Sequence, residues 1–142
     1  MVSQILYNGK AGLIDLDLNQ QQKVLQAYGY PLDMADYSAL MLQGRPKQGQ
    51  TLDDVKNLLL EEISKLRAGD FDEKMLQANI NNFKLYEMQR LESNERRADM
   101  LVNAFVNGAK WEDEVTAIDR MAKLTKADVV AFANKYLTDQ NY

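Results

Sequence analysis

The sequence predicts an α+β fold, in which a small antiparallel or mixed sheet has several helices packed on one face. Two observations predict it. The segments with strand character lie early in the chain, and everything after residue 51 follows helical periodicity. The chain has 142 residues and is 46% hydrophobic, which is enough for one core. We therefore expect a single domain fragment over 1–142, with strands mainly within 11–44 and helices within 51–137.

The first segment is expected to be extended. From Ala11 to Leu18 leucine or isoleucine alternates with aspartate, a pattern typical of a half-exposed strand. Asp15, Asp17 and Asn19 also resemble the first ligands of a calcium-binding EF-hand loop. That loop needs glycine at its sixth position and glutamate at its twelfth, where this sequence has glutamine at both. We interpret these side chains as the solvated face of the segment.

Two further segments predict a hairpin. Residues 23–30 and 37–43 have strand composition, and residues 31–36 between them are long enough for an antiparallel return. The run from Ser38 to Gln43 is apolar enough to suggest a strand buried on both faces. Gly44, Pro46 and Gly49 then indicate a turn.

A helix is expected to follow that turn at once. Thr51 can cap it, and Asp54, three residues on, completes a capping pattern. One face carries apolar side chains at helical spacing, namely Leu52, Val55, Leu59, Ile63 and Leu66. Because the turn is short, we expect this face to pack on the strand from Ala39 to Leu42.

The rest of the chain is expected to be helical. A stretch from Asp70 or Asp72 to about Asn107 is interrupted by the polar residues 89–97, so we expect two helices there. A further helix is expected to use Trp111, Val115, Ile118 and Ala122 as one face. Thr125 and Asp128 repeat the capping pattern and predict a last helix with its apolar side chains, Val129, Phe132, Ala133 and Tyr136, toward the interior.

Composition excludes several functions for this chain. The net charge is −4 with no basic run, which argues against nucleic acid as a partner. No apolar run approaches the roughly 20 residues that span a membrane. The chain has no histidine and no cysteine, so it offers neither a metal ligand of those types nor the imidazole base of Ser-His-Asp or Cys-His catalysis. The cellular compartment stays open.

A few side chains are candidates for binding. Acidic pairs such as Glu61 with Glu62 are interpreted as solvated helix faces, and Arg45 and Lys47 as part of an exposed turn. Aromatic side chains could line a peptide-binding wall or belong to the core, and Trp111 and Tyr37 leave both readings open. Tyr28 and Tyr30 are the substrate-binding candidates, because the sheet face opposite the helices could line a chamber.

Residues 39–77 and the segment from about Tyr86 to Leu137 resemble the non-catalytic domain of the pitrilysin/insulinase family of zinc metallopeptidases. The resemblance covers about residues 11–137. It rests on the strand leading to Gly44-x-Pro46, the acid-rich helix ending in Leu66-x-x-Gly69-x-Phe71, the break at residues 91–94, and the sequence LTKADV that opens the last helix.

The resemblance implies an inactive domain of the mitochondrial processing peptidase type that shapes a substrate chamber. Its partners would be a catalytic peptidase domain, in the same or a partner chain, and a peptide substrate. Zinc would be held by the His-x-x-Glu-His motif of that catalytic domain, so this chain would supply no catalytic residue and no metal ligand. Some members use an arginine and a tyrosine of the inactive half to bind substrate; this chain has neither near residues 18–19 and 24–25.

Two other functions are open to such a chain. A homologue without a zinc-bearing partner would serve as a structural core or interaction subunit, and a free-standing helical interaction module is a third reading. The family domain includes earlier strands and a helix, and usually a further strand after the last helix. We therefore also expect the fragment to self-associate through exposed strand edges.

Overall fold

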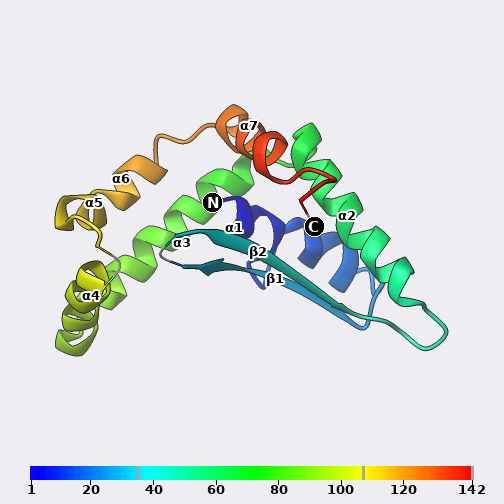
Figure 1. The fold of residues 1–142 in the computed structure, drawn as a ribbon, viewed down its shortest axis with the longest axis horizontal. Coiled ribbons are helices and arrows are strands. Elements are labelled where there is room, and N and C mark those ends of the chain that lie inside the picture. Colours follow the sequence, from blue (N-terminus) through cyan, green and yellow to red (C-terminus); the bar gives the residue numbers. More distant parts are fainter. Residues whose placement is uncertain (35, 107, 142) are drawn as a thin grey trace. The chain divides into compact units, whose positions relative to one another are not determined.

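The computed structural model describes residues 1–34, 36–106 and 108–141, and its elements are labelled in Figure 1. They form two compact units, one of residues 1–76 with 125–142 and the other of residues 77–124. The combination of a two-stranded antiparallel sheet with helices confirms the α+β class.

The first unit contains the sheet. Its elements are helix α1 (Val2–Leu6), π-helix η1 (Asp15–Asn19), strands β1 (Gln26–Asp33) and β2 (Ser38–Arg45), and helices α2 (Leu52–Ala68) and α7 (Lys126–Tyr136). Helix α3 (Glu73–Leu91) begins in this unit and continues into the second. The second unit adds α4 (Asn94–Val106), α5 (Trp111–Val115) and α6 (Ala117–Met121).

Strands β1 and β2 form the expected hairpin, with Gln26 opposite Arg45 and Asp33 opposite Ser38. β1 begins later than expected because Lys23 still donates its backbone N–H to the carbonyl of Leu18, and Gln22 has φ +52°. β1 also continues through Pro31, whose missing N–H is tolerated in a strand at the sheet edge. The expectation that Ser38–Gln43 is buried on both faces is wrong, since these residues are half-buried or exposed.

Helix α2 packs on one face of this hairpin, as its sequence predicts. A Cβ on Gly44 would lie 2.3 Å from Val55 Cγ1 and 3.4 Å from Leu59 Cδ1, so only glycine lets the strand approach the helix this closely. Val55, Leu59 and Leu66 are buried, whereas Leu52 is 76% exposed and does not belong to the buried face. The capping box of Thr51 and Asp54 is formed.

The expectation of an extended segment over Ala11–Leu18 is wrong. Residues 13 and 14 are helical and η1 follows directly. Leu13, Ile14 and Leu18 are buried, so the spacing that matters is that of a helical turn rather than of a strand. The Asp15 carboxylate stabilises the start by accepting N–H groups from Asn8 and Gly12.

The later helices largely follow the sequence. The polar segment separates α3 from α4, which ends at Val106; the expected limit at Asn107 lies outside the described residues. The helix expected after Trp111 is divided into α5 and α6 at Thr116. Thr125 and Asp128 form the second capping box, and Val129 and Ala133 of α7 are buried.

Two side chains of α7 differ from expectation. Phe132 and Tyr136 are each 48% exposed, and their rings lie 4.7 Å apart on the helix surface. None of the described helices combines the length and apolar character needed to cross a membrane.

Candidate functional site

The face of the hairpin opposite α2 carries aromatic side chains. Because side chains alternate along a strand and Gly44 faces α2, its neighbour Gln43 points to the opposite side, together with Tyr28 directly across the hairpin. Tyr30 and Met41, the next pair on that side, are 40% and 37% exposed. We call Tyr28, Tyr30, Met41 and Gln43 the tyrosine face.

The two tyrosines are held in a fixed arrangement. Their rings are stacked with centroids 6.3 Å apart and an angle of 15° between the planes. Tyr28 donates its hydroxyl proton to Gln43 Oε1 at 2.5 Å, and Gln43 Nε2 donates to the Tyr30 hydroxyl at 3.3 Å. One amide therefore orients both phenols, which leaves flat aromatic surface for a ligand.

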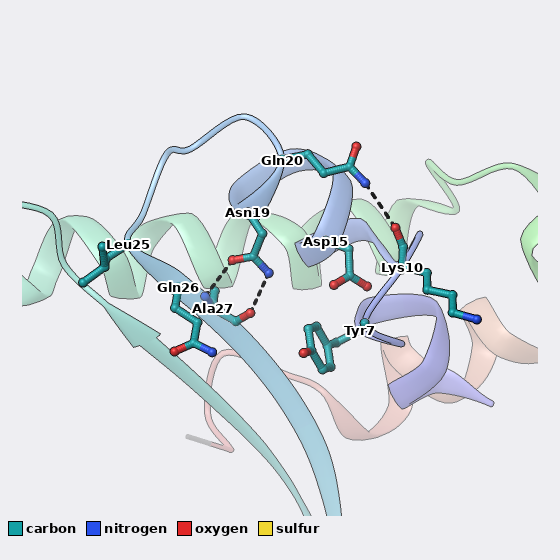
Figure 2. A pocket seen from close by; sticks show the side chains of 9 residues that line it. Tyr7, Lys10, Asp15, Asn19, Gln20, Leu25, Gln26 and Ala27 are labelled. Atoms are coloured by element: carbon teal, nitrogen blue, oxygen red, sulfur yellow. Dashed lines mark hydrogen bonds between the residues drawn. The ribbon is translucent and has the colours of Figure 1, made fainter.

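A pocket of about 540 Å³ lies at the start of β1. Figure 2 shows its lining, which comes from the loop after α1, from η1 and from β1. Tyr7 lines this pocket, and its ring lies 6.4 Å from that of Tyr28 with the planes tilted by 56°. The pocket and the tyrosine face are therefore neighbours.

Asp15 gives the pocket a buried carboxylate. The residue is only 5% exposed, and its Oδ2 accepts the N–H groups of Asn8 and Gly12, each at 3.0 Å. In Figure 2 the carboxylate lies on the side of the pocket where the Tyr7 ring is, and the Lys10 ammonium extends away from it. Gln20 donates to the Lys10 carbonyl at 3.1 Å and thereby ties η1 to the loop before it.

A charged cluster connects η1 to α2. Lys65 Nζ lies 2.6 Å from Asp17 Oδ2 and 2.9 Å from Glu62 Oε1. Burial opposes the charged ammonium, but the hydrogen bonds to the two carboxylates outweigh it and raise the pKa of Lys65. Glu62 is 1% exposed, and this burial raises its pKa although Lys65 favours the charged form.

The three side chains that resemble calcium ligands all have other partners. Asp15 accepts backbone N–H groups, Asp17 pairs with Lys65, and Asn19 binds the backbone of Ala27. Within the described ranges no three acidic side chains gather in a way that could hold a metal ion.

Within the described part of the first unit, no hydrogen bond or ring contact joins Arg45, Lys47 or Tyr37 to the tyrosine face. Lys47 donates to the Gln22 carbonyl at 2.7 Å, and Tyr37 and Trp111 are 65% and 42% exposed. Sequence reasoning missed Tyr7, Asp15 and Gln43 as neighbours of Tyr28 and Tyr30. Gln43 could have been found from the hairpin register, because it follows once the strands are aligned, whereas Tyr7 and Asp15 depend on the helical course of the N-terminal segment.

Comparisons with known proteins place the fold. No family model matches the sequence, and no curated protein matches it. Among solved structures, a protease from Helicobacter pylori is similar with a TM-score of 0.89 at 20% identity. The similarity covers 99% of this chain and 34% of that protease, so this chain spans about a third of its length.

Two Bordetella structures are similar as well. One is the inactive peptidase domain of a candidate zinc protease from Bordetella parapertussis, with a TM-score of 0.84 at 20% identity over 98% of this chain and 75% of that one. The other is a candidate zinc protease from Bordetella pertussis, with a TM-score of 0.84 at 19% identity over 99% and 77%. This chain therefore shares its fold with these three structures.

Proposed function

We propose that this chain is the non-catalytic domain of a zinc metallopeptidase and that its tyrosine face lines the chamber holding the peptide substrate. The observation that carries the proposal is the pair Tyr28 and Tyr30, oriented by Gln43 on the sheet face that α2 leaves uncovered. The likeness to an inactive peptidase domain supports the same reading.

The chemistry of the chain fits a supporting role. It has no histidine and no cysteine, so the zinc ion and the groups that activate water would belong to a catalytic domain in the same or a partner chain. Tyr28 and Tyr30 would bind the substrate. Their 6.3 Å ring spacing is close to the roughly 6.6 Å between alternate side chains of an extended peptide, so two such side chains could each contact one ring.

The test uses the natural assembly, that is, the chain with any covalently linked domains and bound partner chains from its own cells. The tagged assembly is purified and assayed for cleavage of fluorogenic peptides before and after zinc chelation. We expect cleavage that chelation abolishes and added zinc restores.

Tyr28→Ala and Tyr30→Ala should raise KM several-fold with little change in kcat, because they remove substrate binding rather than chemistry. Tyr86→Ala, which removes a 57% exposed tyrosine of α3, is the matched control.

Two results would change the assignment. An assembly without zinc-dependent cleavage would overturn the peptidase proposal and favour the structural or interaction subunit. Zinc-dependent cleavage with an unchanged KM in both tyrosine variants would keep the peptidase but remove the tyrosine face from the substrate chamber.

A further inference from the structure

The Gln43 amide gives the tyrosine face a hydrogen-bond polarity. Its oxygen can only accept a hydrogen bond and its nitrogen can only donate one. Oε1 lies 2.5 Å from the Tyr28 hydroxyl, and Nε2 lies 3.3 Å from the Tyr30 hydroxyl. The shorter distance is typical of an O–H···O bond and too short for an N–H···O bond, so the amide oxygen must be the atom on the Tyr28 side.

The two phenols therefore have different groups left for a ligand. Each phenol has one proton to donate. Tyr28 uses its proton on Gln43, whereas Tyr30 receives a bond from Gln43 and keeps its own proton. Among the described residues none accepts the Tyr30 proton. Tyr30 is 40% exposed and Tyr28 is half-buried, so the available donor is on the more accessible ring.

This arrangement is internal to the hairpin. Tyr28 lies directly opposite Gln43 across the two strands, and Tyr30 is two residues along β1 on the same side. The two rings are stacked with 15° between their planes, and both hydroxyls reach the same amide. The place of the available proton is therefore set by three side chains on two paired strands.

We propose that the Tyr30 hydroxyl donates to a backbone carbonyl of the bound peptide, and that Gln43 is the positioning residue that keeps this proton available. The inference rests on the proposed function and deepens it. Every residue of a peptide carries a backbone carbonyl, so this acceptor does not require a particular substrate sequence. Because only one of the two hydroxyls can donate, the tyrosine face favours one of the two directions in which an extended peptide can lie across it.

The test uses the natural assembly and fluorogenic peptides in which one backbone carbonyl at a time is replaced by a thiocarbonyl, a weaker acceptor. In the wild type, replacement at one position should raise KM about two- to tenfold with kcat unchanged, the effect of one hydrogen bond. Tyr30→Phe lacks the proton, so it should raise KM for the unmodified peptide and remove the thiocarbonyl effect. Tyr86→Phe, at a 57% exposed tyrosine of α3, is the matched control and should retain the effect.

Gln43→Glu tests the positioning role. An ionised glutamate has two acceptor oxygens and no donor, so it takes the protons of both phenols. It should therefore remove the thiocarbonyl effect although Tyr30 is still present. Gln43→Leu cannot accept the proton and should retain the effect. Each variant is compared on two peptides of equal charge, so the added charge of glutamate cancels in the ratio of their KM values. Circular dichroism checks that the variants remain folded.

The outcomes separate this inference from the proposed function. Zinc-dependent cleavage with a thiocarbonyl effect that is equal in the wild type and Tyr30→Phe, or with no such effect at any position, overturns the inference alone. An effect that Tyr30→Phe removes but Gln43→Glu retains overturns the role of Gln43. Absence of zinc-dependent cleavage by the wild type overturns the proposed function and, with it, this inference.

Discussion

The side chain of Asn19 pairs with the backbone of Ala27 as a neighbouring strand would. Asn19 Oδ1 accepts the Ala27 N–H, and Asn19 Nδ2 donates to the Ala27 carbonyl, both at 2.7 Å (Figure 2). Ala27 is fully buried, so its backbone groups have no water to replace these bonds. Asn19 thus fixes η1 against β1 and shapes the pocket beside the tyrosine face.

Replacing this asparagine should be costly. Asn19→Ala removes two hydrogen bonds and leaves a buried N–H and C=O without partners, so we expect a loss of about 2–4 kcal/mol in the free energy of unfolding. Urea unfolding followed by circular dichroism measures it. Asn57→Ala, on the exposed surface of α2, should change the free energy by less than about 0.5 kcal/mol. Equally small effects of the two variants would show that the two hydrogen bonds between Asn19 and Ala27 contribute little to the free energy of unfolding.

Leu59 is one of the buried apolar contacts of α2 with the hairpin. It is 8% exposed and lies against Gly44. Leu59→Ala should lower the free energy of unfolding by about 2–5 kcal/mol, because it removes buried methyl groups and leaves a cavity. Leu52→Ala, at a position that is 76% exposed on the same helix, is the matched control. A loss below about half a kcal/mol for Leu59→Ala would contradict the packing described here.

The buried Glu62 should make stability depend on pH. Burial raises the pKa of Glu62 in the folded chain above the ordinary value of 4.5, which the unfolded chain keeps. At a pH between the unfolded and the folded pKa, the folded chain therefore holds a proton that the unfolded chain has released. Stability must therefore fall as pH rises through this interval. Glu62→Gln lacks this titration. The wild type should lose stability relative to Glu62→Gln as pH increases from 4.5, measured by thermal unfolding across the range.

The control for this pH dependence is Glu61→Gln at the exposed neighbouring position. It removes a carboxylate from the exposed surface of the same helix, so it measures the effect of losing one negative charge there. A constant difference between the wild type and Glu62→Gln would mean that Glu62 titrates normally in the folded chain. Lys65 makes stability depend on pH in the alkaline range. Its pKa is raised in the folded chain, so its contribution to the free energy of unfolding is complete below pH 10.5 and is lost as pH rises through the folded pKa.

The chain by itself should bind no stoichiometric zinc and cleave no peptide. Zinc prefers nitrogen and sulfur ligands, and the sequence has neither histidine nor cysteine. Elemental analysis after dialysis against zinc-free buffer, with a fluorogenic peptide assay on the same sample, checks both statements. One tightly held zinc ion per chain would contradict this prediction.

Local interactions explain which features could be predicted from sequence. The helix starts at Thr51 and Thr125 depend on side chains three residues away, Asp54 and Asp128, so the pattern is complete within one turn. The hairpin could also be predicted, because its two strands are consecutive segments of the chain joined by a short loop. The short turn and the apolar spacing of α2 together indicated that the helix packs on the strand before it, whereas the close approach at Gly44 emerged only from the structure.

Interactions between distant residues decided the rest. The sequence of Ala11–Leu18 alternates like a strand, but burial of Leu13, Ile14 and Leu18 and the capping by Asp15 favour a helical course. Phe132 and Tyr136 follow the helical period of α7, yet they lie beyond the surface that the rest of the unit covers. Periodicity identifies a face but not how wide a part of it is buried.

What the sequence determined by itself is therefore the α+β class, the order of hairpin and helices, and the absence of histidine and cysteine. Only the tertiary structure decided that Asp17 pairs with Lys65, 48 residues away, that Asn19 braces Ala27, and that Tyr7 joins Tyr28 beside a pocket. The physical reason is range: caps and periodicity act within a turn or two of the chain, whereas these contacts form only after burial has brought separate segments together.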